Sequence, residues 1–233
     1  MAFNKDSLDL ATTYCTDREK YNQMKNNGEI DSRLDDFMVN NFADYNFSPL
    51  AEEVPVHMLG YKPYEPKHGY DGYLGETYTS ATKYLEVKPQ KSYFNEEKGK
   101  IMNKLNGKWA FADYTIKRYH QDVNLGTNLR MVIPGYVNGE LVYIITFPFN
   151  HSTFIDRIKV LTEEAVEKNK ARCVPSGGNK FFKDCPDLRV DFSISREKLD
   201  KFYEDKYITK EIYDIVKDSQ ENKSEYDILK FAV

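Results

Sequence analysis

The sequence has no long apolar run, and it has few of the residues that build disulfide frameworks and metal clusters. A membrane-spanning helix needs about 20 predominantly apolar residues in a row, and no segment approaches that length. The N-terminal residues, Met-Ala-Phe-Asn-Lys-Asp, lack the apolar centre of a signal peptide. The 3 cysteines, Cys15, Cys173 and Cys185, are odd in number and widely spaced, which is typical of reduced thiols. We therefore expect a cytoplasmic protein with no membrane partner.

Several common kinds of site are excluded because their spacings are missing. The 4 histidines have no metal-ligand spacing with one another or with the cysteines, so no zinc site is expected. The segment 176–180, Ser-Gly-Gly-Asn-Lys, is rich in glycine but lacks the G-x-x-x-x-G-K-[ST] pattern of a nucleotide-phosphate loop. No G-x-S-x-G pattern marks a hydrolase serine. The function has to be sought among other residue types.

The composition is that of an ordinary globular protein. Of the 233 residues, 40% are hydrophobic and 30% are charged, so the chain can bury a core. No internal repeat or linker divides it. We predict a single domain over residues 1–233, with its core over about 30–195 and a helical C-terminal segment over 196–233.

The net charge of −4 is unevenly distributed along the chain. Residues 1–82 carry 7 Lys and Arg against 14 Asp and Glu, whereas residues 83–118 carry 9 against 4. A positive segment beside acidic residues suits a phosphate backbone that approaches a metal site. The alternative interpretation is a solvated helix face.

The first 69 residues predict helices followed by a loop. The capping-box spacing of Thr16–Glu19 predicts a helix start, Gly28 predicts a stop, and a cap at residues 31–32 begins a further helix. Four prolines crowd residues 48–69, so no long helix is expected there. We predict a loop with a short strand near Val56–Leu59.

The rest of the chain alternates strands and helices. Asn138-Gly139 is the strongest hairpin signal, because both residue types tolerate positive φ. Strands are expected over 70–75, 82–88, 109–116, 129–133, 141–147 and 188–194. Helices are expected over 95–107 and 152–169 and after caps at Ser195 and Thr209. The predicted fold class is α/β (α+β), with a central mixed β-sheet of about five strands flanked by helices.

One strand of this sheet combines residue types that suit phosphodiester chemistry. Glu86 and Lys88 share a face of the strand over 82–88, since residues i and i+2 point the same way. Asp71, at the end of the neighbouring strand, can approach Glu86 within the reach of one cation. Mg²⁺ prefers such oxygen ligands, polarises phosphoryl oxygens and lowers the pKa of bound water. Lys88 would orient or help to deprotonate the attacking water, or offset charge on the phosphate.

Two further expectations test this interpretation. If the two carboxylates repel each other, Glu86→Gln should leave the stability of the metal-free protein unchanged or raise it. The alternative is an ordinary edge strand, on which Glu86 and Lys88 form an exposed ion pair worth at most about 1 kcal/mol.

These residues resemble the signature of the PD-(D/E)xK nuclease superfamily, which includes many type II restriction endonucleases. Asp71 matches its first acidic position and Glu86-Val87-Lys88 its E-x-K triplet, while Tyr70 stands in place of the proline. The resemblance spans about residues 30–165 and includes a helix before the aspartate, a hairpin that carries the motif, and a helix after it. It implies a restriction-endonuclease-like fold, catalytic roles for Asp71, Glu86 and Lys88, and Mg²⁺ or Mn²⁺ held by Asp71 and Glu86.

The resemblance also implies supporting residues that the sequence leaves open. Family members often add an acidic residue from the preceding helix, and the candidates here are Asp35, Asp36, Glu52 and Glu53. Further auxiliary candidates are Glu76 and Gln90. The candidates for DNA contacts are Lys91, Lys117, Arg118 and Arg130.

We therefore expect a metal-dependent DNA endonuclease that acts on duplex DNA as a homodimer, because two sites then address two strands. The alternative is a non-catalytic nucleic-acid-binding protein, or a phage-type accessory or assembly protein.

Overall fold

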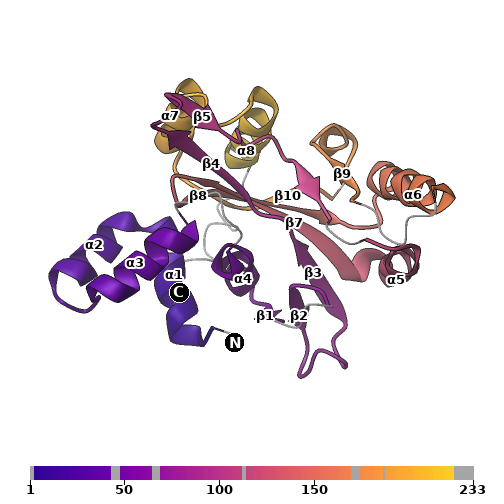
Figure 1. The fold of residues 1–233 in the computed structure, drawn as a ribbon, viewed down its shortest axis with the longest axis horizontal. Coiled ribbons are helices and arrows are strands. Elements are labelled where there is room, and N and C mark those ends of the chain that lie inside the picture. The colour runs from indigo at the N-terminus through magenta and orange to yellow at the C-terminus, as the bar shows by residue number, and fades with distance from the viewer. Residues whose placement is uncertain are drawn as a thin grey trace.

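A computed structural model describes residues 3–42, 48–64, 69–111, 114–168, 174–185 and 187–222. The fold class is confirmed, because a mixed β-sheet lies at the centre and α-helices cover both of its faces (Figure 1). The described helices are α1 (Lys5–Thr16), α2 (Arg18–Asn26), α3 (Ser32–Phe42), α4 (Pro49–Met58), α5 (Ile116–Leu125), α6 (Ser152–Glu167), α7 (Arg196–Glu204) and α8 (Lys210–Asn222). In these ranges, no helix combines the length and apolar character that crossing a bilayer requires.

Within the described residues, the central sheet has eight strands and is larger than predicted. They are β1 (Lys62–Pro63), β2 (Gly72–Leu74), β3 (Lys83–Val87), β4 (Gln90–Asn95), β5 (Lys100–Met102), β7 (Leu129–Val137), β8 (Glu140–Pro148) and β10 (Arg189–Ser193). Strands β3 and β4 both pair in parallel with β7, at successive positions along it, and β8 pairs with the other edge of β7. The short strands β6 (Trp109–Ala110) and β9 (Ser176–Gly177) form a separate pair.

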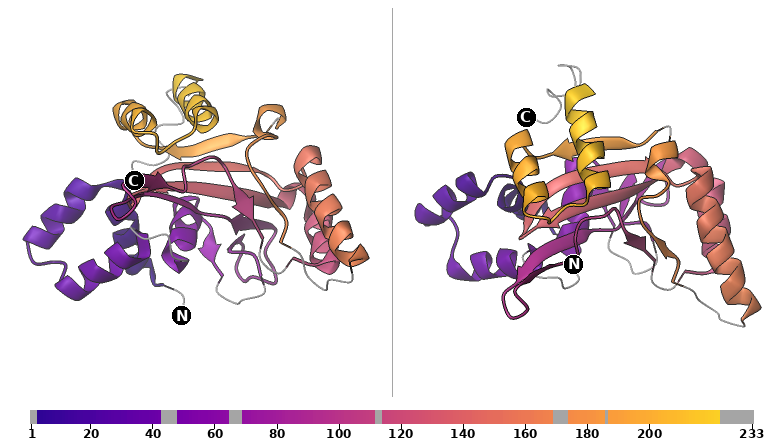
Figure 2. Two further views of the ribbon diagram at one scale, coloured as in Figure 1. Left: turned by 45° about the horizontal axis from the view of Figure 1, so that its top comes forward. Right: turned by 90° about the horizontal axis from the view of Figure 1, so that it is seen from above.

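Two hydrophobic cores lie on opposite faces of the sheet. Helices α1 to α4 cover one face, on which Leu85 and Val87 are buried, as their place on β3 predicts. Helices α5 to α8 cover the other face, where Trp109, Phe147 and Phe154 pack together. Figure 2 shows this layering, with α7 and α8 on one side of the sheet and the N-terminal helices on the other.

The predicted N-terminal helices are confirmed with small changes at their caps. The Asp17 side chain, one residue after the predicted start, accepts from the Lys20 N–H and caps α2. Gly28 ends that segment with φ +78°, a conformation that glycine adopts without strain. Asp31 caps α3 by accepting from the Leu34 N–H.

The predicted loop over residues 48–69 is wrong, because α4 occupies its first half. Pro49 is the first residue of this helix, where its missing N–H removes no hydrogen bond. The Ser48 side chain accepts from the Ala51 N–H at 3.3 Å and caps the helix. Pro55 does remove an internal hydrogen bond, at a usual cost of about 3 kcal/mol, but α4 buries one whole side against the sheet. Burial therefore overrides the proline signal.

Two other predicted elements are wrong. Residues 95–107 contain no helix, because β4 and β5 form a hairpin whose turn includes Gly99 at φ +56°. The strand predicted over 109–116 ends at Ala110, and Thr115 caps α5 by accepting from the Arg118 N–H. In both segments a short apolar spacing fits helix and strand equally well, so tertiary pairing decides.

The remaining long elements are confirmed. Strands β7 and β8 form a hairpin around Asn138 (φ +48°) and Gly139 (φ +81°), the two positive-φ residues that the turn requires. Strand β10, helix α6 and the two C-terminal helices occupy the predicted segments, and Ser195 caps α7. The fold therefore presents the β2–β3 hairpin beside α4 and α5.

Candidate active site

The β2–β3 hairpin places Asp71 opposite Glu86. Gly72 pairs with Leu85 in antiparallel register. Because the two strands run in opposite directions, Asp71, which precedes Gly72, lies opposite Glu86, which follows Leu85. Directly opposite side chains share one face, with Cβ atoms about 5 Å apart. The Asp71 carboxylate also accepts from the Val87 N–H at 2.6 Å, which anchors it to the strand that carries Glu86.

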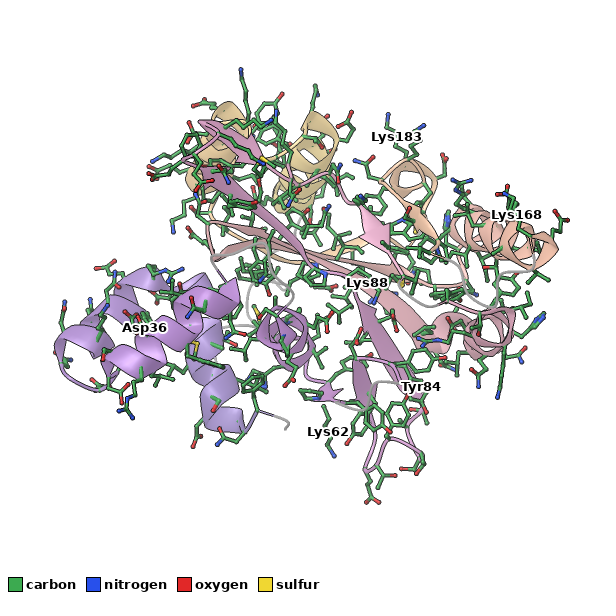
Figure 3. All side chains as sticks on the ribbon, in the orientation of Figure 1. Asp36, Lys62, Tyr84, Lys88, Lys168 and Lys183 are labelled. Atoms are coloured by element: carbon green, nitrogen blue, oxygen red, sulfur yellow. The ribbon has the colours of Figure 1, made fainter. Side chains whose placement is uncertain are left out.

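The Lys88 ammonium lies among oxygen atoms of these residues. Figure 3 labels Lys88 near the middle of the molecule. Its Nζ is 2.7 Å from Glu86 Oε1, 2.9 Å from the Val87 carbonyl oxygen and 3.9 Å from Asp71 Oδ2. Glu86 Oε1 and Asp71 Oδ2 both lie within 3.9 Å of the same nitrogen, so the two carboxylates are close neighbours. The three residues that the sequence singled out do converge.

The edge-strand alternative is wrong, because β3 lies inside the sheet between β2 and β7. Glu86 is only 6% exposed. A buried carboxylate needs charged or hydrogen-bonding partners to remain ionised. Glu86 has two cationic partners, since Arg118 Nη2 lies 2.7 Å from the Oε2 atom that Lys88 leaves free.

A buried network on α5 holds Arg118 in this position. Asp122, one helical turn further on and fully buried, accepts from Arg118 Nε at 2.8 Å. The hydroxyls of Tyr70 and Tyr114 each donate to Asp122 at 2.7 Å. The Arg118 guanidinium also lies over the Tyr70 ring, 4.6 Å from its centroid. The network thus joins α5 to the hairpin and orients Glu86.

Helix α4 adds a fourth carboxylate, that of Glu52. Among the charges that act on Glu52 are those of Asp71, Lys88 and Glu86. Burial, followed by the negative charge of Asp71, raises the pKa of Glu52 from 4.5 to about 8. The charges of the motif residues therefore reach Glu52 on α4.

The pKa values show where negative charge is in excess. Burial and the Glu86 charge raise the pKa of Asp71 from 3.8 to about 6. Burial also opposes ionisation of Glu86, but Lys88 and Arg118 outweigh it, so the pKa of Glu86 is lowered. Burial alone would lower the pKa of Lys88, but Glu86 and Asp71 outweigh it and the net direction is upward. Lys88 is therefore a cation in this state.

The cluster as a whole has more acidic than basic groups. Among the described residues, Glu52, Asp71, Glu86 and Asp122 are opposed by Lys88 and Arg118, which leaves an excess of two negative charges when all six groups are ionised. A divalent cation would offset this excess. The oxygens around the Lys88 ammonium are of the kinds that Mg²⁺ prefers, two carboxylates and a main-chain carbonyl. These residues therefore fit a hard divalent cation, although no three His, Cys, Asp or Glu side chains within the described part of the chain are already arranged around one point.

Asp36, Glu76 and Gln90 lie elsewhere, and Glu53 is next to Glu52 in the sequence. Asp36 is exposed on α3, well away from Lys88 (Figure 3). Glu76 is exposed in the turn between β2 and β3, and Glu53 is half-buried on α4. Gln90 binds the loop after β5 instead, through the Asn106 side chain at 2.9 Å and the Gly107 N–H at 2.8 Å. Glu52 is thus the acidic side chain of α4 that the charges of the motif residues reach.

The basic candidates for DNA contacts divide in the same way. Lys91 donates to the Asn41 carbonyl, Arg130 pairs with Asp187 at 2.6 Å, and Arg118 pairs with Glu86. Lys117 is exposed on α5, next to Arg118. Arg118 therefore has a positioning role that its charge alone did not indicate.

Sequence reasoning missed Asp122, Tyr70 and Tyr114 as parts of the site. The i, i+4 spacing of Arg118 and Asp122 is a local sign of a helical ion pair, but no helix was predicted for this segment, which follows the strand expected over 109–116. The predicted reduced state of the cysteines agrees with Cys15 and Cys185, which are free and buried; Cys173 lies outside the described residues.

No protein-family model matches this chain, and no curated protein matches it.

Proposed function

We propose that the protein is a Mg²⁺- or Mn²⁺-dependent DNA endonuclease of the PD-(D/E)xK type, with a restriction-endonuclease-like core. The observation that carries the proposal is the convergence of Asp71, Glu86 and Lys88 on one face of the β2–β3 hairpin, in a cluster with excess negative charge. A surface ion pair needs neither a buried glutamate nor a second acidic strand. A divalent-cation site built on this hairpin would use both.

The order of elements supports the same proposal. Helix α4 precedes the hairpin, α5 follows it in the chain, and β7 then pairs in parallel with β3. The resemblance includes a helix before the aspartate, a hairpin that carries the motif, and a helix after it. The helix expected over 95–107 is replaced by the β4–β5 hairpin, so α5, which follows β4, β5 and β6, would take the place of the later helix. Glu52 on α4 occupies the place of the acidic residue that such nucleases often add from the preceding helix.

The residues have distinct roles in hydrolysis. Glu52, Asp71, Glu86 and the Val87 carbonyl would hold the cation, which when bound polarises a phosphoryl oxygen and lowers the pKa of a nearby water. Arg118 holds Glu86 Oε2, so that Oε1 keeps its direction toward the site. Lys88, released from the carboxylates when their charge is offset, is placed to orient the attacking water or to stabilise the charge that develops on the phosphate. Water adds to phosphorus as one ester oxygen leaves and takes up a proton.

The proposed partner is DNA, and a homodimer would let two sites address the two strands of a duplex. Lys117 on α5 is an exposed cation on the helix that carries Arg118. It is therefore the basic candidate best placed for a phosphate contact.

The test is cleavage of supercoiled plasmid, linear duplex and single-stranded DNA in Mg²⁺ or Mn²⁺. We expect Asp71→Ala and Lys88→Ala each to reduce the rate by about 100-fold or more, because each removes a group that acts on the reacting phosphate. Lys83→Ala is the matched control, since Lys83 is an exposed lysine on the opposite face of β3 and should keep the wild-type rate. Thermal unfolding of each variant shows whether it is folded.

Two outcomes would contradict the proposal. One is cleavage that persists in both folded active-site variants. The other is a folded wild-type protein that cuts no form of DNA with either cation, which would favour a binding or assembly protein instead.

A further inference from the structure

The face of the sheet that carries the carboxylates continues into a row of tyrosines. Strand pairing sets Lys62 opposite Tyr73 and Tyr73 opposite Tyr84, so these three side chains share one face of β1, β2 and β3. The next row is the catalytic one, in which Asp71 lies opposite Glu86. Tyr64 belongs to this second row, because its N–H donates to the Asp71 carbonyl.

The aromatic rings of this region form one connected cluster, made of Tyr64, Tyr70, Tyr73, Tyr78 and Tyr84. The rings of Tyr64 and Tyr78 stack at 3.5 Å between centroids, and Tyr73 meets both of them edge-on, at 6.2 Å and 5.6 Å. The contacts of Tyr84 with Tyr78 (5.5 Å) and Tyr70 (5.0 Å) complete the connection to the site. Each of the five is partly exposed.

The hydroxyl groups divide the cluster into an inner and an outer part. The inner tyrosines use their hydroxyls within the fold: Tyr70 donates to Asp122, Tyr84 donates to main-chain carbonyls, and Tyr78 accepts from the Tyr70 N–H. Within the described ranges, the hydroxyls of Tyr64 and Tyr73 make no such bond. Hydrogen bonding within the fold thus accounts for the hydroxyls of the inner three tyrosines but not for those of the outer two.

We propose that Tyr64 and Tyr73 form a stacking surface for an unpaired nucleobase next to the scissile phosphate, and that Lys62 contacts a neighbouring phosphate. The inference rests on the proposed function, since the carboxylate row fixes where the reacting phosphate would lie. Adjacent rows on one face are about 7 Å apart along a strand, so a nucleotide beside the reacting one comes over the tyrosines. A paired base cannot reach them, because its faces are covered by its neighbours in the duplex.

One positive charge, that of Lys62, lies beside the tyrosine cluster and suits a phosphate contact. The Lys62 ammonium is exposed and is held over the turn after β2 by the carbonyls of Gly75 and Glu76, at 2.9 Å and 3.2 Å. Its remaining proton can reach a phosphate oxygen. The substrate class that follows is DNA with an unpaired or extruded base at the cleavage site, such as a single strand, a flap or a mismatch.

The test measures binding without cleavage, in EDTA, with a single strand that carries the fluorescent base 2-aminopurine and with a matched duplex. We expect quenching of 2-aminopurine on the single strand, because stacking on an aromatic ring quenches its fluorescence. Tyr64→Leu and Tyr73→Leu should each weaken single-strand binding about tenfold and reduce the quenching, while duplex binding changes much less. Tyr73→Phe, which keeps the ring, should restore most of the lost affinity.

The matched control is Tyr203→Leu, which removes a partly exposed tyrosine stacked on Tyr213 at the far side of the molecule. It should bind both probes as the wild type does. The inference is overturned if folded Tyr64→Leu and Tyr73→Leu lose no affinity, or if they lose it equally for the single strand and the duplex. If the tyrosine variants lose affinity for the single strand only, but the wild-type protein cuts no DNA, the stacking surface is supported and the nuclease proposal is rejected. If the wild-type protein cuts DNA but the variants show no selective loss of single-strand affinity, only the stacking surface is rejected.

Discussion

Glu52 and Glu86 show how environment gives two residues of one type opposite properties. Glu86 lies between Lys88 and Arg118, and these cations lower its pKa despite its burial. Glu52 is half-buried on α4 near Asp71, and burial with that negative charge raises its pKa to about 8. The expectation that Glu86 is the repelled carboxylate is therefore reversed: repulsion acts on Glu52 and Asp71, and Glu86 is an ion-pair partner.

This difference predicts opposite effects of two glutamine variants in the metal-free protein. Folded Glu52 keeps its proton up to a pKa of about 8, whereas the unfolded chain loses it near 4.5, so wild-type stability falls as pH rises between these values. Glu52→Gln should lack this fall and exceed the wild type by roughly 1–3 kcal/mol at pH 8, a range reduced for partial exposure. Glu86→Gln should instead lower stability by about 3 kcal/mol at neutral pH, because it leaves two cations without their shared partner.

Urea unfolding in EDTA across pH 5–8 measures both changes. A Glu52→Gln profile parallel to that of the wild type would contradict the electrostatic assignment of Glu52. Equal or higher stability of Glu86→Gln at neutral pH would contradict the ion-pair assignment of Glu86.

At the scale of elements, α4 and α5 bring the supporting residues to the hairpin. Helix α4 forms despite Pro55, because one of its sides is buried against the sheet, and it carries Glu52 to the site. Helix α5 carries Arg118 and Asp122, whose ion pair the two tyrosine hydroxyls complete. The α4 segment was predicted as a loop and no helix was predicted for the α5 segment, so the parts of the site that they supply were not foreseen.

The docking of α5 predicts a specific effect of Asp122→Asn. Loss of this charge leaves Arg118 with Glu86 alone and disturbs two buried hydroxyl bonds, so stability should fall by about 2 kcal/mol. In the cleavage assay the variant should lower kcat while changing KM little, because the orientation of Glu86 changes while the surface that binds DNA does not. Asp214→Asn on α8 is the control, since it breaks an exposed i, i+4 pair with Lys210 and should have far less effect. Equal effects of the two variants on unfolding by urea would show that the network is not a structural link.

At the scale of the whole molecule, a bound cation should be linked to global stability. The excess negative charge of the cluster destabilises the folded metal-free state, and a ligand that binds only the folded state raises its stability by mass action. Mg²⁺ at about 100 times its Kd would add about 2.7 kcal/mol, which for a chain of this size raises the Tm by roughly 5–10 °C.

Differential scanning calorimetry with and without Mg²⁺ measures this shift. Asp71→Asn should abolish it, whereas Asp36→Asn on α3 should retain it, because Asp36 is remote from the cluster (Figure 3). A shift that survives Asp71→Asn would place the cation elsewhere.

The sequence by itself determined the features that depend on near neighbours. Alternation along β3 placed Glu86 and Lys88 on one face, the antiparallel partner strand supplied Asp71, and Asn138-Gly139 specified the long hairpin. Each follows from the two-residue period of a strand or from the φ values of a tight turn, so no knowledge of the rest of the molecule was needed.

Only the tertiary structure decided which remote residues complete the site. The selection of Glu52 among four acidic candidates, the pairing of Arg118 with Glu86, and the burial that raises or lowers each pKa all depend on how α4 and α5 pack against the sheet. Helix packing is governed by the burial of whole faces, which here outweighed proline and short apolar patterns. A local pattern carries no information about such distances, because they are set by side chains tens of residues apart.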